Sequence, residues 1–177
     1  MLKLIGKTIL LRALEPEDLS FLYELENNPD LWEVSGTVTP YSQYVLKQYL
    51  ENAHRDIYEV KQLRLAIGAK TGKVVGLIDL FDFDPKNRRV GLGLVIAGQE
   101  DRNKGIGSEA VALICQYAFS VLGVHQLYAN VLEDNSASIH LFEKMGFEIA
   151  GCKKDWILSN GQFKNELLFQ KLHHECI

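Results

Sequence analysis

The feature of this chain with the clearest chemical meaning is a glycine-containing loop, Arg102-Asn-Lys-Gly105-Ile-Gly107. An apolar run at 90–96 precedes the loop, and apolar residues at helical spacing follow it as far as Val121, so we expect a strand, a turn and a helix. The first amide groups of a helix lack partners within the helix, and its dipole favours negative charge there. Because glycines let the main chain approach a phosphate closely, the loop predicts a site for a phosphorylated cofactor.

Two other interpretations of the loop remain open at this point. Gly105-x-Gly107-x-x-Ala110 satisfies the dinucleotide-binding fingerprint, which would indicate a nicotinamide or flavin protein. That fingerprint normally begins a βαβ unit with an acidic residue about twenty positions later, whereas here hairpins come first and Glu133 ends the following strand. A tight strand–helix turn that binds nothing is the plainest alternative. A P-loop is excluded, because no Gly-Lys-Ser/Thr ends the loop.

A second group of polar residues lies about thirty positions further along the chain. An expected strand at 125–132 ends in Glu-Asp, and Asn135-Ser-Ala-Ser138 then begins a short helix. Asn135 suits the N-cap of that helix. The helix passes through Phe142 and stops at Gly146-Phe147. The two groups are far more specific together than either is alone.

Together these blocks resemble the GCN5-related N-acetyltransferase (GNAT) superfamily, and within it the branch with ribosomal-protein N-terminal and spermidine N-acetyltransferases. Three further segments also fit that branch: residues 9–18 near the start of the chain, Asn87-Arg-Arg89 leading into the strand before the glycine loop, and the late hairpin turn at Asn160-Gly-Gln162. The resemblance implies one α/β (α+β) domain over residues 1–177, with a central mixed, mostly antiparallel twisted sheet of about seven strands flanked by about four helices. It also implies transfer of an acetyl group from acetyl-CoA, as cosubstrate, to a primary amine in a ternary complex.

The resemblance further implies which residues bind the cofactor. Backbone amides of the glycine loop, with Ser108, would hold the pyrophosphate, and the preceding strand would hydrogen-bond the pantetheine arm. Asn135 would contact the pantetheine, cap its helix, or do both. The expected cofactor-binding residues are Leu94, Val95, Ile96, Arg102, Asn103, Lys104, Gly105, Ile106, Gly107, Ser108, Asn135 and Phe142.

The chain departs from the superfamily at two catalytic positions. Phe142 stands where relatives often carry a tyrosine that protonates the leaving thiolate, and Gly91 stands where many carry a glutamate base. A thiol with a pKa near 8.5 leaves tolerably unaided, and a general acid is typically worth about 10²–10⁴-fold. Ser138 and Tyr128 are the candidate acids, and Asp79 is the candidate base. A catalytically weak or inactive acyl-CoA-binding module is therefore the alternative function.

Acidic residues dominate the stretch from 13 to 46, which contains no Lys or Arg. In the family this region lines the acceptor cleft, so an acidic lip would attract a small cationic amine, a polyamine or a basic protein N-terminus. A solvated helix face is the simpler interpretation. Strand alternation places Asp79 and Asp82 on opposite faces, so at most one of them faces a given cleft. The expected acceptor-binding residues are Glu24, Trp32, Glu33 and Asp82.

Composition narrows the class of protein. The 177 residues, 47% hydrophobic and 24% charged, are typical of one globular domain. A net charge of −4 without a Lys/Arg cluster argues against nucleic acid as a partner, and no apolar run is long enough to span a membrane. Three cysteines without paired metal-ligand spacing predict reduced thiols in the cytoplasm and no metal site. A homo-oligomer is compatible with all of these features.

The elements that must position the polar residues alternate along the chain. Hairpins come first and one helical crossover follows, which favours a mixed sheet. We expect strands at 7–14, 62–69, 74–83, 90–96, 125–132, 147–158 and from the Asn160-Gly161 turn to about 172, with helices at 16–28, 41–56, 106–121 and 135–145.

Overall fold

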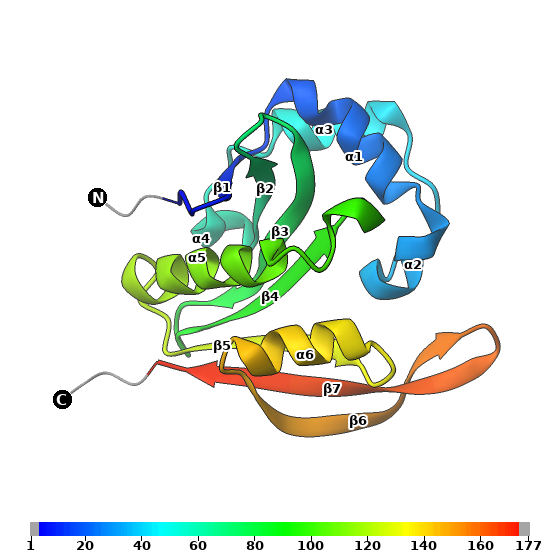
Figure 1. Cartoon of the computed structure of the whole chain (residues 1–177), viewed down its shortest axis with the longest axis vertical. Coiled ribbons are helices and arrows are strands. Elements are labelled where there is room, and N and C mark those ends of the chain that lie inside the picture. The colour runs from blue at the N-terminus through cyan, green and yellow to red at the C-terminus, as the bar shows by residue number, and fades with distance from the viewer. Residues whose placement is uncertain (1–3, 174–177) are drawn as a thin grey trace.

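The computed structural model describes residues 4–173, and its centre is a twisted seven-stranded sheet with helices on both faces (Figure 1). β4 and β5 pair in parallel, and the other neighbouring strands are antiparallel. The expected α/β fold with a mixed, mostly antiparallel sheet is therefore confirmed. The strands are β1 (Ile9–Ala13), β2 (Leu63–Ala69), β3 (Val74–Asp84), β4 (Arg89–Ile96), β5 (Gln126–Leu132), β6 (Glu148–Ser159) and β7 (Gln162–Leu172), in the spatial order β1-β2-β3-β4-β5-β7-β6.

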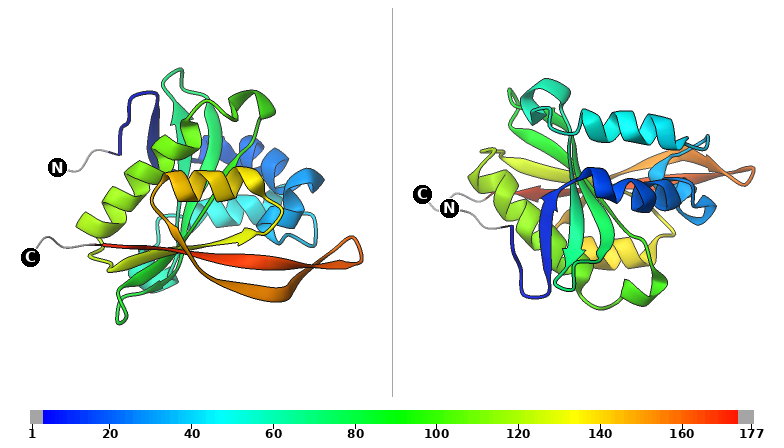
Figure 2. Two further views of the ribbon diagram at one scale, coloured as in Figure 1. Left: turned by 60° about the horizontal axis from the view of Figure 1, so that its bottom comes forward. Right: turned by 90° about the horizontal axis from the view of Figure 1, so that it is seen from above.

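The helices form a layer on each face of the sheet. Leu22 and Leu46, from the first and third helices, pack on Leu77 of β3, whereas the fifth helix packs Ala110 and Ile114 with Ile78 on the opposite face. In the right-hand view of Figure 2 the strands separate the third helix from the fifth and sixth. The helices are α1 (Leu19–Glu26), α2 (Pro29–Ser35), α3 (Gln43–Glu51), α4 (Ile57–Val60), α5 (Ile106–Ser120) and α6 (Ser136–Lys144), with 3₁₀ turns at Pro16–Asp18 and Gln99–Asp101.

Two short helices, α2 and α4, differ from the sequence prediction. From the sequence, Pro29 is expected to end a helix, but in the structure it begins α2. The Asn28 side chain caps α2 by accepting from the Asp30 amide at 3.0 Å. The helix expected at 41–56 spans only Gln43–Glu51, and a separate helix, α4, begins after Asp56, whose side chain caps it by accepting from the Tyr58 amide at 2.7 Å. Both differences arise at residues that suit either the end or the start of a helix.

The feature that matters most for function is the way β4 and β5 separate. Their pairing joins Arg89–Gly91 to Gln126–Tyr128 and stops there, while β4 stays paired with β3 as far as Ile96. From Leu92 onward, the edge of β4 that faces β5 has no strand partner among the described residues. Its main-chain N–H and C=O groups are strong hydrogen-bonding groups and are available to a ligand.

The β6–β7 hairpin extends well beyond the other elements (Figure 2, left). Near its tip Leu158 and Phe163 are direct cross-strand partners that are 63% and 61% exposed, and Trp156 is 58% exposed. No helix within residues 4–173 is long and apolar enough to cross a membrane. The cytoplasmic location expected from the cysteines stays a prediction.

Candidate active site

A cleft of about 690 Å³ begins where β4 and β5 separate. At one end its walls are Gly93–Val95 of β4, Asn130–Leu132 of β5, and side chains from the start of α6. At the other end α1, α2 and α3 enclose it together with polar side chains of β2 and β3. The cleft therefore connects the open edge of β4 to the region that the sequence predicts for the acceptor.

The glycine loop forms the start of α5 beside this open edge. Gly105 is the N-cap residue with a left-handed φ of 82°, and no side chain caps the helix there. Arg102 ties the loop to the end of β4, because its guanidinium donates to the Ile96 carbonyl at 3.2 and 3.3 Å. A Cβ atom at Gly107 would lie 3.4 Å from Leu141 and 3.5 Å from Leu94, which is van der Waals contact, so α5 begins packed against β4 and α6. An uncapped helix start in this setting fits a pyrophosphate group.

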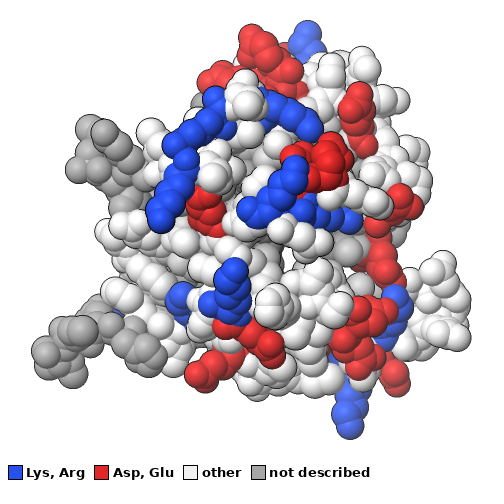
Figure 3. All heavy atoms as spheres, viewed as in Figure 1, with Lys and Arg blue, Asp and Glu red and all other residues white. Residues whose placement is uncertain are grey.

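Glu109 is the acidic residue in the first turn of α5, where its charge would oppose a phosphate. Its side chain is instead turned toward the chain before β1, where it accepts from the Thr8 amide at 3.0 Å and from the Thr8 hydroxyl. Burial opposes the charge, but the hydrogen bonds from Thr8 outweigh it and lower the pKa of Glu109. Figure 3 shows lysine and arginine side chains around the start of α5 and acidic ones along the side formed by α2 and the hairpin.

Two of the three expected catalytic residues, Asp79 and Ser138, line the cleft, and Tyr128 does not; Phe142, which is expected at the cofactor, lines it too. The Ser138 amide donates to the Asn135 side chain at 3.1 Å, so Asn135 caps α6 while also lining the cleft. Tyr128 lies where β4 and β5 are still paired, outside the cleft lining.

Phe81 explains why glycine occupies position 91. A Cβ atom on Gly91 would lie 2.3 Å from the Phe81 ring, which no real structure tolerates without movement. The same ring packs edge-on against Tyr128, with centroids 5.8 Å apart. A glutamate at position 91 would therefore require Phe81 to move, and in this chain the aromatic ring fills the place of that carboxylate.

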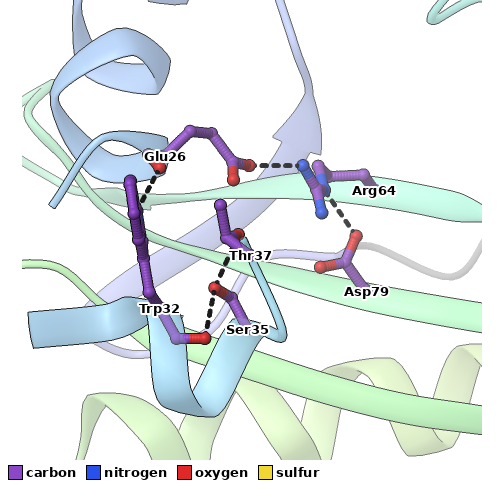
Figure 4. A network of polar contacts seen from close by, with 6 residues as sticks. All are labelled: Glu26, Trp32, Ser35, Thr37, Arg64 and Asp79. Carbon is purple, nitrogen blue, oxygen red and sulfur yellow. Dashed lines mark hydrogen bonds and ion pairs between the residues drawn. The ribbon is translucent and has the colours of Figure 1, made fainter. Parts of the chain in front are cut away.

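Arg64 is a site residue that the sequence prediction missed. Its Nε donates to Asp79 at 2.7 Å and its Nη1 donates to Glu26 at 2.8 Å (Figure 4). Burial opposes the charge, but the Asp79 carboxylate outweighs it, so the pKa of Arg64 lies above its ordinary value. The one available signal was a lone arginine between Leu63 and Leu65 in an apolar strand, since a charge in such a place needs a partner.

The residues expected to bind the acceptor separate into two groups. Glu33 lines the cleft and pairs with Lys164 of β7, and Lys164 also contacts Asp134 at 2.7 Å. Trp32 is outside the lining, and its indole N–H donates to the Glu26 carbonyl at 2.9 Å, which holds α2 against α1.

The other two predicted acceptor residues lie elsewhere. Glu24 lines a separate hollow of about 280 Å³ next to Lys73. Asp82 is exposed at a bulge in β3, where its φ is 48°, and it does not line the cleft. Asp79 therefore faces the cleft and Asp82 does not, in agreement with the expected alternation of the strand.

The fold and the cleft together place this chain in the class of α/β enzymes that transfer an acyl group from coenzyme A. Comparison with known proteins gives the family. Residues 8–148 match the model of the acetyltransferase (GNAT) domain, and the chain belongs to this family. It is an acetyl-CoA-dependent N-acetyltransferase, as the glycine loop and the Asn135 block predict, and the nicotinamide or flavin interpretation falls away.

Individual relatives are similar over almost the whole chain. Spermidine N(1)-acetyltransferase of Escherichia coli (strain K12) is 29% identical over 170 residues, which cover 96% of this chain and 89% of that protein. The crystal structure of spermidine N-acetyltransferase from Vibrio cholerae in complex with CoA and spermine matches with a TM-score of 0.83 and 25% identity, over 94% of this chain and 96% of that one. A dodecameric structure of the Vibrio cholerae enzyme matches with a TM-score of 0.78 and 25% identity, over 94% and 95% of the two chains.

Proposed function

We propose that this enzyme acetylates a small cationic primary amine, with a polyamine as the first candidate, by direct attack within a ternary complex. The observation that carries the proposal is the continuous cleft, which runs from the open edge of β4 to a wall containing Glu26, Glu33 and Asp79. The relatives named for spermidine support the same class of acceptor. A protein N-terminus, which the sequence resemblance also suggests, stays a prediction.

The cofactor would lie along the open edge of β4 and across the start of α5. The main chain from Arg102 to Gly107, with Ser108, holds the pyrophosphate, and the edge of Leu94–Ile96 bonds the pantetheine arm as an added strand would. An amide of this edge polarises the acetyl carbonyl, on which negative charge develops during attack. Acetyl-CoA supplies the activated thioester.

The amine must lose a proton before it can attack. A primary amine has a pKa near 10.4 and arrives protonated, so a carboxylate at the wall favours its capture. We assign the base role to Asp79, which is the register partner of Gly93 on the adjacent strand; neighbouring strands lie about 4.8 Å apart. Ser138 lies one helical turn before Phe142 and is the better placed donor to the leaving thiolate, because Tyr128 is outside the cleft lining.

Release of free CoA thiol with a panel of amines tests this proposal. The panel contains monoamines, diamines, polyamines and a peptide with a free N-terminus, each at the same concentration of acetyl-CoA. We expect cationic small amines to give the fastest release and a mass increase of one acetyl group on the amine. If no amine raises CoA release above hydrolysis while acetyl-CoA still binds, the chain is the acyl-CoA-binding module that its departures at Gly91 and Phe142 suggest.

We also propose that the chain forms a homo-oligomer. The dodecameric structural neighbour supports this, and so do the exposed apolar side chains of Leu158 and Phe163 at the hairpin tip. Sedimentation of the wild-type chain and of a Phe163→Ser variant would check it. A monomer at every concentration tested would contradict the proposal.

A further inference from the structure

We propose that Arg64 is a positioning residue for the acetyl transfer: it acts through Asp79, fixing the place of that carboxylate in the cleft lining and tying it to the α1 wall of the cleft. The inference rests on the proposed function, in which Asp79 removes the proton of the acceptor amine. Arg64 itself would touch neither the acetyl group nor the attacking nitrogen.

The sheet register places Arg64, Asp79 and Gly93 in one row across three strands. Arg64 of β2 is the partner of Asp79 of β3, and Asp79 is the partner of Gly93 of β4. Direct cross-strand partners present their side chains on the same face, about 5 Å apart. Gly93 has no side chain, and β4 is open toward β5 beyond this point. The Asp79 carboxylate therefore has the Arg64 guanidinium on one side and, on the other, the part of the cleft that Gly93 lines.

Two directed hydrogen bonds fix the guanidinium. Arg64 donates at 2.7 Å to Asp79 and at 2.8 Å to Glu26, and the three side chains are only 23%, 18% and 15% exposed, respectively. Its Cζ lies 5.6 Å from the centre of the Tyr49 ring, which limits movement toward α3. Because the guanidinium is planar and its donors point in fixed directions, it can bridge two carboxylates on different elements. A lysine ammonium keeps the charge but lacks that geometry.

The same arrangement connects the proposed base to the helices that enclose the acceptor. The Glu26 carboxylate accepts from Arg64, while the Glu26 main-chain carbonyl accepts from the indole of Trp32 in α2 (Figure 4). The position of Asp79 relative to α1 and α2 is therefore set through one arginine. We infer that a change at Arg64 alters how well the amine and the carboxylate are aligned, and that it leaves the cofactor end of the cleft as it is.

Arg64→Lys is the first test, since it preserves the charge and removes the bridging geometry. We expect kcat for the best amine to fall about tenfold or more, because a small misplacement of a catalytic group is costly. The Kd of acetyl-CoA should stay within about twofold of the wild-type value, since loop 102–107 is not touched. Arg55→Lys is the matched control, because Arg55 pairs with Glu59 at the surface. It should leave kcat, KM and the Kd of acetyl-CoA unchanged.

A double-mutant cycle distinguishes action through Asp79 from a general structural effect. Asp79→Asn alone should lower kcat strongly, and Arg64→Lys added to it should lower kcat little further, because residues acting as a unit are not additive. If the two losses in kcat multiply, or if Asp79→Asn has no effect, Arg64 does not act through Asp79 and the inference is wrong. A wild-type enzyme that acetylates no amine would instead overturn the proposed function before the cycle begins.

Chemical rescue keeps the test decisive if Arg64→Lys folds poorly. Methylguanidinium added to Arg64→Ala should restore part of kcat in a saturable way, and it should do nothing for the Arg64→Ala/Asp79→Asn double variant. Folding is checked by circular dichroism in the presence of the same concentration of methylguanidinium. Absence of rescue in a folded Arg64→Ala variant would contradict a positioning role.

Discussion

Phe142 belongs both to the core and to the cleft. It is 3% exposed, its ring lies 5.1 Å from that of Phe147 and 6.0 Å from that of Phe169, and yet it lines the cleft. An apolar side chain in this place offers no proton to a leaving thiolate, whereas Ser138, one turn earlier on α6, also lines the cleft. Of these two residues, only Ser138 therefore has a hydroxyl to offer the leaving thiolate.

Phe142→Tyr tests this residue directly. The new hydroxyl would lie at the cleft and could act as an acid, so we expect turnover to be preserved or raised, within the range of about 10²–10⁴-fold that general acids supply. Steady-state kcat at saturating acetyl-CoA is the measurement. Phe147→Tyr is the matched control, because Phe147 is equally buried and does not line the cleft, and it should give no gain. A loss of about tenfold in a folded Phe142→Tyr variant would show that Phe142 shapes the site.

At the scale of elements, the start of α5 and the open edge of β4 meet at Gly107. A Cβ atom at this position would be in van der Waals contact with Leu94 of β4 and Leu141 of α6. Gly105 in turn needs its left-handed φ to begin the helix at this point. The glycines therefore serve two purposes, which are close packing of three elements and access to main-chain amides.

Gly107→Val should weaken acetyl-CoA binding by about tenfold or more, because its branched side chain would crowd Leu94 and Leu141 and cover the amides. Isothermal titration calorimetry with acetyl-CoA measures the change. Gly151→Val is the control, since nothing lies within 4 Å of a Cβ at that strand position. Equal affinity in both folded variants would place the pyrophosphate elsewhere.

The entry to α1 supplies a prediction about stability and pH. Asp18 is 5% exposed and accepts from both Arg12 Nη atoms at 2.7 and 2.8 Å and from the Glu15 amide at 2.8 Å. The hydrogen bonds from Arg12 lower the pKa of Asp18 below its ordinary value. A lowered pKa gives a stability contribution that is present above the unfolded-state pKa of about 3.9 and is lost as the pH falls through the folded-state value.

Asp18→Asn should therefore reduce the free energy of unfolding at pH 7 by about 2–3 kcal/mol. The difference from wild type should shrink as the pH falls from about 4 through the lower folded-state pKa, because the unfolded wild-type chain takes up the Asp18 proton before the folded protein does. Urea unfolding over this pH range measures both. The exposed neighbour Glu17 provides the control, and Glu17→Gln should change stability by less than about 0.5 kcal/mol. A difference that does not depend on pH would contradict the role of the charge.

Local and long-range contacts explain which parts of the site the sequence predicts. The loop 102–107 and the cap at Asn135 are visible because their residues are neighbours in the chain. Arg64 is not, because Asp79 and Glu26 lie 15 and 38 positions away and only the sheet register and α1 bring them together. Pro29 suits both the end and the start of a helix, so α2 was missed. The separation of β4 from β5 is a backbone feature with no residue signature of its own.

At the scale of the whole molecule, charge is distributed in the way that two unlike ligands need. Basic side chains lie around the start of α5 with an acidic group among them, and mostly acidic ones lie along α2 and the hairpin (Figure 3). One of these acidic side chains already has a partner, since Glu33 of α2 pairs with Lys164. Lys164 also contacts Asp134, so two carboxylates share one ammonium and this group keeps a net negative charge beside the cleft.

The KM of a cationic amine should therefore rise with added salt, because screening at 0.15 M acts over about 8 Å. Glu33→Gln should raise this KM as well, since Glu33 lines the cleft. From the sequence the same effect is expected of Glu24, but Glu24 lies in the separate hollow, so Glu24→Gln serves as the control and should change KM little. If neither added salt nor Glu33→Gln changes the KM of the amine, the acidic helices are only a solvated surface.

The open edge of β4 also has a thermodynamic consequence. Beyond Gly91, β4 and β5 are not paired. Main-chain N–H groups on that edge of β4 should exchange their hydrogens with water faster than N–H groups that are bonded between paired strands. A cofactor that bonds to this edge completes the sheet, so its binding free energy adds to the stability of the fold, by about 2.7 kcal/mol at a concentration 100 times the Kd. The amount of acetyl-CoA in the surroundings would then set how long the protein survives unfolding and proteolysis as well as how fast it works.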